Sequence, residues 1–332
     1  MSAFGAAISE HPDAAAAVGE VVGAVVERIG VEPDIAVLFV GGHPGDRFDD
    51  IASAVRRLLS PRTIIATTVA AAIGCDLEVE EGPAVSLWAG HVGAAEAVRL
   101  ETIRTQEGTA VVGMPDDAAI GRRTLILLSE PDSFPADAFL HASNEQYPGL
   151  ACVGGVASAP GGPGSNRLFV DGSFHTDGAI GILLPEGLGE FTVVSQGCRP
   201  VGAPLTVTDA DANLIRGLGS RPALERLQEL YDVANDDERA LISNGLHVGL
   251  AVDENTESFG RGDFLVRGII GADHAAGALR IGAQAPVGTT LQFQVRDADS
   301  ARTDLQESLR SVDADAALVF VCNGRGHRLF GD

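Results

Sequence analysis

Short apolar runs alternate with helical patterns along the first half of the chain. The runs Ile35–Val40 and Thr63–Thr68 predict two buried strands, and apolar residues at helical spacing predict a helix between them, from about Asp46 to Leu59. A further apolar run, Ala84–Ala89, predicts a third strand. At the N-terminus, the alanine-rich spacing across Met1–Gly30 predicts one amphipathic helix, capped by Asp13.

The same order of elements returns further along the chain. A strand is predicted at Thr124–Glu130, a helix from about Pro135 to Tyr147, and strands at Leu150–Ala157 and Gly178–Leu184. Proline and glycine are too dense in Ala159–Gly164 for a helix or a central strand, so this segment is predicted to be a loop. We interpret the two stretches as an internal duplication.

The second half is predicted to be richer in strands. A helix opens near Pro222, where proline suits the first turn. The predicted strands are Leu246–Val252, Phe264–Ile270, Ala278–Gly282 and Thr289–Arg296. Apolar residues alternate with glutamines in the last strand, which is typical of a sheet with one solvent-exposed face. A helix is then expected over Ala298–Leu309, and a strand at Ala316–Val321 leads into a turn.

These patterns predict an α/β protein of the α+β kind. We expect two domains, residues 1–188 and 189–332, each a mixed and largely antiparallel sheet flanked by helices. Because sheets with one apolar face need helices on that side, a layered α-β-β-α arrangement is the favoured architecture.

The amino-acid composition excludes or disfavours several classes of function. The 332 residues include 46 Asp and Glu against 23 Lys and Arg, and all of the basic residues are arginines. The absence of lysine excludes a P-loop and Schiff-base chemistry, and the net charge of −23 disfavours nucleic-acid and membrane-surface partners. The longest apolar stretch, near Thr63–Ile73, is too short to span a bilayer. Four widely spaced cysteines are expected to be free thiols, and we expect a cytoplasmic location.

No cofactor or metal site is predicted. The eight histidines show no metal-ligand spacing. His175 with Asp171 and Asp177 forms a loose candidate, but a hairpin with solvated polar residues explains that group equally well.

Arginines are the predicted ligand-binding groups. Arg199, Arg267 and Arg325 each lie beside glycine or at a strand end, and a guanidinium fork suits a carboxylate. The alternative is an internal ion pair, with the candidate partners Asp209, Asp211 and Asp263. Asn166, Arg167 and Asp263 are secondary candidates for the site.

Nucleophilic catalysis is a second hypothesis. Cys322 is expected on a sharp turn before Asn323 and Gly324, with His327 five residues further on as a candidate base. The competing interpretation is a small apolar residue buried at a strand end, as is usual for free cysteines.

Five short motifs resemble a known family. They are Gly197-Cys-Arg-Pro-Val-Gly202, Pro204-Leu-Thr-Val-Thr208, Arg221-Pro-Ala-Leu224, Phe259-Gly-Arg-Gly-Asp-Phe-Leu-Val-Arg267 and Cys322-Asn-Gly-Arg-Gly326. Together they resemble the C-terminal domain of the FIST pair, and Gly149–Gly155 and Asp177–Gly181 resemble FIST N. The family normally continues past the Cys322–Gly326 turn through a helix and a closing strand, so the resemblance implies an incomplete FIST C domain here.

The resemblance implies a sensory module that binds small ligands such as amino acids. We therefore expect a cytoplasmic signal-transduction protein with its site between the two halves. The residues expected to line the site are Gly197, Cys198, Arg199, Arg267, Cys322, Asn323, Gly324 and Arg325. Expected partners are a small-molecule ligand and a signalling protein or a second copy of the chain. A third hypothesis is an interaction scaffold that recruits another chain through an open edge at Ala316–Val321.

Overall fold

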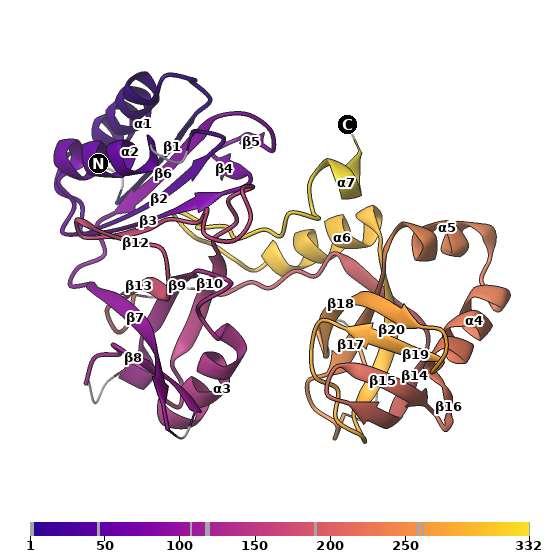
Figure 1. Cartoon of the computed structure of the whole chain (residues 1–332). Helices are drawn as coiled ribbons and strands as arrows, with labels where there is room; N and C mark the ends of the chain where they lie inside the picture. The colour runs from indigo at the N-terminus through magenta and orange to yellow at the C-terminus, as the bar shows by residue number, and fades with distance from the viewer. Residues whose placement is uncertain are drawn as a thin grey trace. The chain divides into compact units, whose positions relative to one another are not determined.

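The computed structural model describes residues 3–44, 47–106, 108–116, 120–188, 191–256, 259–260 and 262–331. The chain folds as two compact units (Figure 1). The first comprises Met1–Thr192 together with Asp313–Asn323, and the second comprises Val193–Val312 together with Gly324–Asp332. Seven helices and largely antiparallel sheets in the described residues confirm the predicted α+β class.

One sheet of the first unit is covered by two helices. Its strands, in spatial order, are β1 (Phe4–Ser9), β6 (Ala84–Gly90), β2 (Ile35–Gly41), β3 (Thr63–Val69), β11 (Leu168–Val170) and β12 (Ser173–His175). Helices α1 (Ala14–Ile29) and α2 (Arg47–Leu59) bury their apolar sides against this sheet. Asp13 caps α1, as predicted, by accepting a hydrogen bond from the backbone N–H of Ala16.

A second sheet completes the first unit. It consists of β10 (Ala151–Val156), β9 (Thr124–Ser129), β13 (Ala179–Leu183), β7 (Glu96–Thr105) and β8 (Gly108–Val112). Helix α3 (Ala136–Gln146) packs on one face, and the other face packs against the first sheet. The predicted α-β-β-α layering is therefore present in this unit. A short 3₁₀ turn (Ile120–Arg122) precedes β9, and β4 (Ala72–Gly74) pairs with β5 (Leu77–Val79).

The predicted duplication is visible in the strand pairing of the first unit. Strand β2 pairs in parallel with β3 and antiparallel with β6. In the same way, β9 pairs in parallel with β10 and antiparallel with β13. Each half therefore consists of a strand, a helix and a parallel strand. A third strand then pairs antiparallel with the first strand along its other edge.

The second unit is built on a closed barrel. The strands in order are β14 (Cys198–Asp211), β20 (Thr290–Arg296), β17 (Leu246–Ala251), β18 (Phe264–Asp273), β19 (Ala278–Ile281) and β15 (Leu214–Leu218). Pairing of β15 with β14 closes the barrel, and β16 (Arg221–Pro222) extends β15. Its helices are α4 (Ala223–Val233), α5 (Asp236–Gly245), α6 (Ala298–Leu309) and α7 (His327–Phe330). Apolar residues such as Val248, Leu291 and Phe293 fill the interior.

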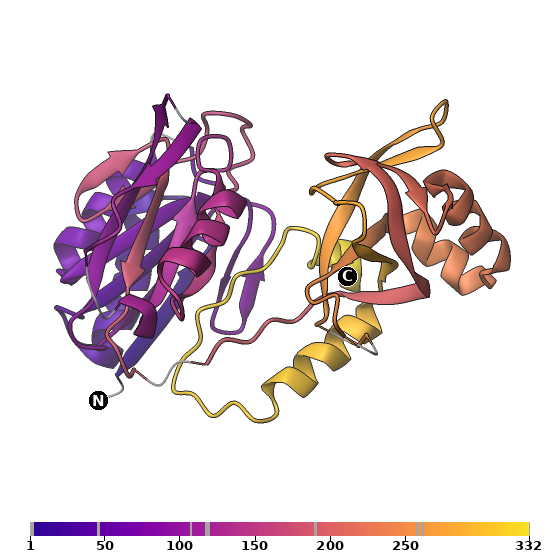
Figure 2. The ribbon, with the colours of Figure 1, turned by 90° about the horizontal axis from the view of Figure 1, so that it is seen from below.

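Three predictions need correction. The N-terminal segment is not one helix, because the alternating burial of Phe4–Ser9 places a strand before α1. Ala316–Val321 forms no strand and so provides no open sheet edge; Figure 2 shows it in yellow as an extended trace. The expected solvent-exposed face of β20 is covered, because Gln292 and Gln294 are both buried. The predicted start of α2 at Asp46 lies outside the described residues.

Candidate functional site

A cleft of about 350 Å³ lies between α6 and the outer face of the barrel. Its volume is at the lower end of the range typical of small-molecule sites. The described residues that line it are Val194, Gln196, Cys198, Pro200, Gly260, Gly262, Phe264, Gln294, Asp304, Glu307 and Ser308. All of them belong to the second unit.

Strand alternation explains which side chains face the cleft. Pro200 pairs directly with Gln294, and Cys198 lies two residues before Pro200, so these three side chains share one face. The intervening positions, Arg199 and Val201, lie on the opposite face, where Val201 contributes to the barrel core. Because successive side chains of a strand point to opposite faces, one set is buried in the barrel core and the other borders the cleft.

Gln294 is the unusual residue in this cleft. Its side chain is only 3% exposed. No other residue within the described ranges makes a hydrogen bond to its amide group. The amide atoms are not among the fully buried side-chain atoms that lack a hydrogen bond in the described residues, so solvent in the cleft reaches the amide end. An amide that lines a cleft and is not hydrogen-bonded to the described residues offers a donor and an acceptor to a ligand.

Gly249 and Phe264 lie beside Gln294, and Phe264 lines the cleft. A Cβ atom on Gly249 would lie 2.8 Å from Cβ of Phe264 and 3.0 Å from Nε2 of Gln294, so only glycine fits. Phe264 is buried, and its ring packs 5.0 Å from the ring of Phe259. Nε2 of Gln196 donates to the carbonyl oxygen of Phe264 at 2.9 Å.

Helix α6 forms the other wall and is held at its N-terminus. Asp297 accepts hydrogen bonds from the hydroxyl of Ser300 at 2.6 Å and from Nε of Arg199 at 3.1 Å. The Ser300 hydrogen bond is the main reason that the pKa of Asp297 is lowered, with Arg199 adding to it. Further along the helix, Asp304 accepts from the backbone N–H of Gln196 at 3.0 Å. These contacts join α6 to the segment that enters β14.

Several residues predicted for the site lie close together around the start of β14. The register places Arg296 opposite Cys198, and the guanidinium of Arg296 donates to the carbonyl of Gly324 at 3.0 Å. Arg325 donates to the carbonyl oxygens of Ser195 and Ala301 at 2.9 and 3.2 Å. The later residues of the Cys322–Gly326 turn are therefore hydrogen-bonded to the second unit.

Gly197 is a packing position within the same group. A Cβ atom on it would lie 3.4 Å from the Leu329 side chain and 3.7 Å from the Ala301 side chain. Gly197 therefore allows α6 and α7 to approach the start of β14.

The remaining arginines do not line the cleft. Arg199 pairs with Asp297 and with Glu238, so it makes an ion pair, although not with any of the three aspartates considered from the sequence. Arg267 lies opposite Val248 in the β17–β18 pair, on the strand face opposite to that of Phe264. Its guanidinium donates to the carbonyl of Val266, and it forms no ion pair with any described residue.

Cys322 and Asn323 belong to the first unit and are exposed. The Cys322 thiol has no hydrogen-bond partner among the described residues. No described base is hydrogen-bonded to this thiol, and catalysis by Cys322 stays a prediction. The competing prediction of a buried position is wrong, because Cys322 is exposed. Asp263, a secondary candidate, accepts from the backbone N–H of Gly260 at 2.7 Å and so shapes the loop before β18.

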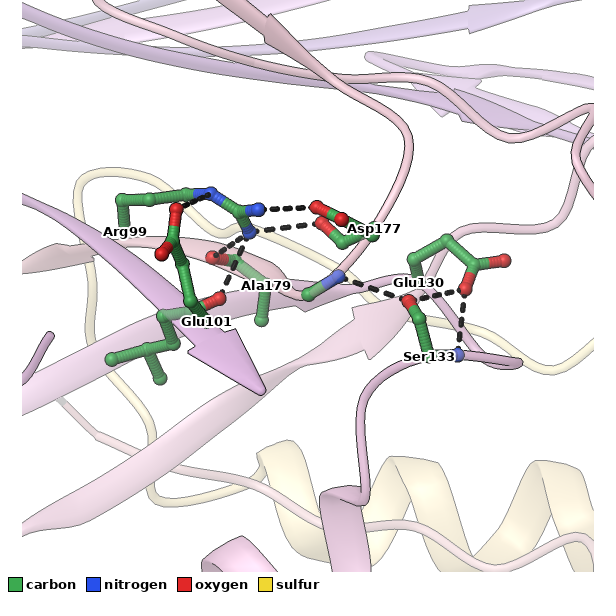
Figure 3. A network of polar contacts seen from close by, with 8 residues as sticks. Arg99, Glu101, Glu130, Ser133, Asp177 and Ala179 are labelled. Carbon is green, nitrogen blue, oxygen red and sulfur yellow. Dashed lines mark hydrogen bonds and ion pairs between the residues drawn. The ribbon is translucent and has the colours of Figure 1, made fainter. Parts of the chain in front are cut away.

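A second polar network lies in the first unit (Figure 3). Glu130 is buried and accepts hydrogen bonds from the hydroxyl of Ser133 at 2.6 Å and from Nδ2 of Asn166 at 3.1 Å. Burial alone raises the pKa of Glu130, but these bonds and two from backbone N–H groups together lower it. The Ser133 hydroxyl in turn accepts from the N–H of Gly178 at 2.9 Å. The carboxylate of Glu130 is thus hydrogen-bonded to groups of the protein itself, and we interpret its role as structural.

The neighbouring candidates are engaged in the same way. Asn166 accepts from the N–H of Ala159 at 2.9 Å, and Arg167 donates to the carbonyl of Gly164 at 2.8 Å, so both brace the glycine-rich loop. Arg99 joins β7 to the start of β13 by donating to the carboxylate of Asp177 at 2.5 Å (Figure 3). Within the described ranges, no three His, Cys, Asp or Glu side chains come close enough to hold a metal ion.

Sequence reasoning missed the two glutamines and Phe264. The alternation of Gln292 and Gln294 with apolar residues was visible, but it was interpreted as a solvent-exposed face. Gln292 donates to the carbonyl of Gly202 at 2.7 Å, whereas Gln294 faces the cleft. An exposed strand face usually carries charged side chains. Two uncharged amides at these positions were therefore the available sign that this face is covered.

The fold is a two-unit α+β chain with a barrel in the second unit, and sequence comparison identifies the family. The FIST N domain model matches residues 34–221, and the FIST C domain model matches residues 223–332. The chain therefore belongs to the FIST family, with both domains present. FIST domains are associated with sensory and signal-transduction roles.

Mycobacterial proteins are similar over almost the whole chain. Uncharacterized protein Mb0898c of Mycobacterium bovis is 40% identical over 335 residues, covering 99% of this chain and 86% of the relative. Uncharacterized protein Rv0628c of Mycobacterium tuberculosis is 38% identical, covering 99% of this chain and 87% of the relative. None of the helices, over the residues that the structure describes, has the length and hydrophobicity needed to cross a membrane.

Proposed function

We propose that this chain is the ligand-sensing part of a signal-transduction protein and that the cleft under α6 is its binding site. The observation that carries the proposal is Gln294, a residue only 3% exposed that lines the cleft and whose carboxamide makes no hydrogen bond to the described residues. A bound molecule would supply the missing hydrogen bonds. It would also touch α6 directly, since Asp304, Glu307 and Ser308 line the same cleft.

The cleft volume suits a ligand of amino-acid size. Capture of a carboxylate by an arginine has less support. Arg199 is committed to Asp297, Arg325 to backbone carbonyls, and Arg267 lies on the other strand face. We therefore assign recognition to the polar groups of the cleft, with Gln294 at the centre, and not to the three arginines.

We also propose a cytoplasmic location. The four cysteines, Cys75, Cys152, Cys198 and Cys322, are not disulfide-bonded, and a reducing compartment keeps such residues as thiols.

A thermal-shift screen of amino acids and other small polar molecules tests the binding proposal. We expect at least one compound to raise the melting temperature of the wild-type protein, because binding to the native state alone stabilises it. The same compound should have little effect on a Gln294→Leu variant. Gln306→Leu, on the exposed side of α6, is the matched control and should respond like the wild type. A shift of the same size in Gln294→Leu would place the site elsewhere.

A further inference from the structure

We infer that the cleft recognises a carboxamide or lactam, a group that presents a hydrogen-bond donor beside an acceptor. This inference rests on the binding site proposed above and names the chemical class of its ligand. It starts from Gln294, whose planar amide offers one acceptor oxygen and one NH₂ donor side by side.

Hydrogen-bond complementarity distinguishes the candidate ligand groups. A carboxylate has acceptors only, so it could bind Nε2 of Gln294 but would leave Oε1 facing another oxygen. An ammonium group has donors only, so it would leave Nε2 unpaired. An amide, a lactam or the amide-like edge of a heterocycle satisfies both atoms at once. At a side chain that is 3% exposed, leaving either atom unpaired weakens binding substantially.

The amide of Gln294 lies on the strand face that borders the cleft. Nε2 lies 3.0 Å from the point that a Cβ atom on Gly249 would occupy, so the amide fills the space left by the absent side chain. Cys198 and Pro200 lie on the neighbouring strand, on the same face as Gln294. Gln294 lines the cleft, and its amide makes no hydrogen bond to the described residues.

The other walls combine apolar surface with the polar side chains of Asp304, Glu307 and Ser308. Phe264 and Pro200 supply apolar surface, and Val194 adds an aliphatic side chain. The donor of Gln196 is already used by the carbonyl of Phe264, which fixes Gln196 as part of the frame. A planar amide attached to a small ring or a short chain would fill this volume.

Matched pairs of an amide and its acid test the inference. The probes are nicotinamide with nicotinate, benzamide with benzoate, and glutamine with glutamate, each titrated into the full chain by ligand-observed NMR. We expect at least one amide to bind about tenfold tighter than its acid, since the acid leaves one buried polar atom unsatisfied. The Gln294→Leu variant should lose this preference, and the exposed-site control Gln306→Leu should keep it.

The outcomes separate the ligand class from the site. Acids that bind as well as or better than their amides, with loss of binding in Gln294→Leu, would overturn the carboxamide inference and leave the proposed site standing. Amide binding unchanged in Gln294→Leu would overturn the role given to this residue. Absence of binding by every amide, by every acid and by the amino-acid panel of the previous section would overturn the site and the inference together.

Discussion

Nε2 of Gln294 lies 3.0 Å from the point that a Cβ atom on Gly249 would occupy. The two residues are on adjacent strands, β20 and β17, with Gly249 opposite Gln292 in the register. A missing side chain on one strand therefore makes the space that the amide on the next strand fills. This relation links a single glycine to the polar wall of the cleft.

Gly249→Ala is expected to disturb the cleft. The new methyl group would meet Cβ of Phe264 at 2.8 Å, so Phe264 and Gln294 must both move. Overpacking of this kind costs about 1–3 kcal/mol of unfolding free energy, and ligand binding should weaken with it. Urea denaturation and ligand titration measure the two effects. Gly268→Ala on the neighbouring strand is the control, because a Cβ atom there meets nothing within 4 Å. Equal effects of the two variants would contradict the packing argument.

Glu130→Gln is expected to destabilise the first unit. The carboxylate accepts from the Ser133 hydroxyl, from Asn166 and from two backbone N–H groups, and a neutral amide cannot accept from all of them. We expect a loss of about 2–4 kcal/mol in the free energy of unfolding. Urea denaturation measures the change, with the exposed Asp132→Asn as the matched control. A loss no larger than that of the control would show that the network contributes little.

Stability is expected to fall on the acid side of neutrality. Burial lowers the pKa values of His43, His175 and His247 below the ordinary value of 6.5. The unfolded chain therefore takes up protons first as the pH falls through 6.5, and the native state loses stability until its own lowered pKa values are reached. Above that range these groups are neutral in both states and add no pH dependence.

His247→Gln is expected to reduce this acid-side loss. Urea denaturation at about pH 8, 6.5 and 5.5 compares the slope with that of the wild type. The exposed His274→Gln serves as the control. An unchanged slope in His247→Gln would show that this histidine does not carry the effect. His247 pairs directly with Gln294 across the strands, so the variant also reports on the cleft face.

Phe320→Ala is expected to destabilise the first unit. The Phe320 ring meets the ring of Phe39 edge to face at 6.1 Å, and a Cβ atom on Gly155 would lie 3.2 Å from it. Loss of this half-buried ring should cost about 1–3 kcal/mol, less than for a fully buried phenylalanine. Fluorescence of Trp88, the single tryptophan, reports unfolding of the same apolar cluster. Val319→Ala, at a position 53% exposed, is the control, and an equal loss there would contradict the docking of Phe320.

The periodicity of the sequence predicted the layered unit well. Buried runs such as Ile35–Val40 and Thr124–Glu130 are strands, and the repeated order of elements predicted a repeated topology that the pairing confirms. The barrel was not foreseen, because closure depends on β14 pairing with two different strands around a break in register between Val201 and Leu205. No local pattern encodes such a long-range pairing.

The site was only partly predictable. Cys198 and its glycine-rich surroundings drew attention to the right segment, and the structure places Cys198 in the cleft wall. Arg199 is one residue away on the opposite strand face, a distinction that needs the register. The strand pattern at Ala316–Val321 was equally ambiguous. Its alternating burial resembles a strand, yet its apolar side chains dock on the first unit without a strand partner.

A crystal structure of the chain with the tightest-binding carboxamide tests the central claim most directly. We expect the compound in the cleft under α6, with its amide within about 3.2 Å of both Oε1 and Nε2 of Gln294. A compound bound elsewhere, while the amide of Gln294 still lacked a partner, would contradict it.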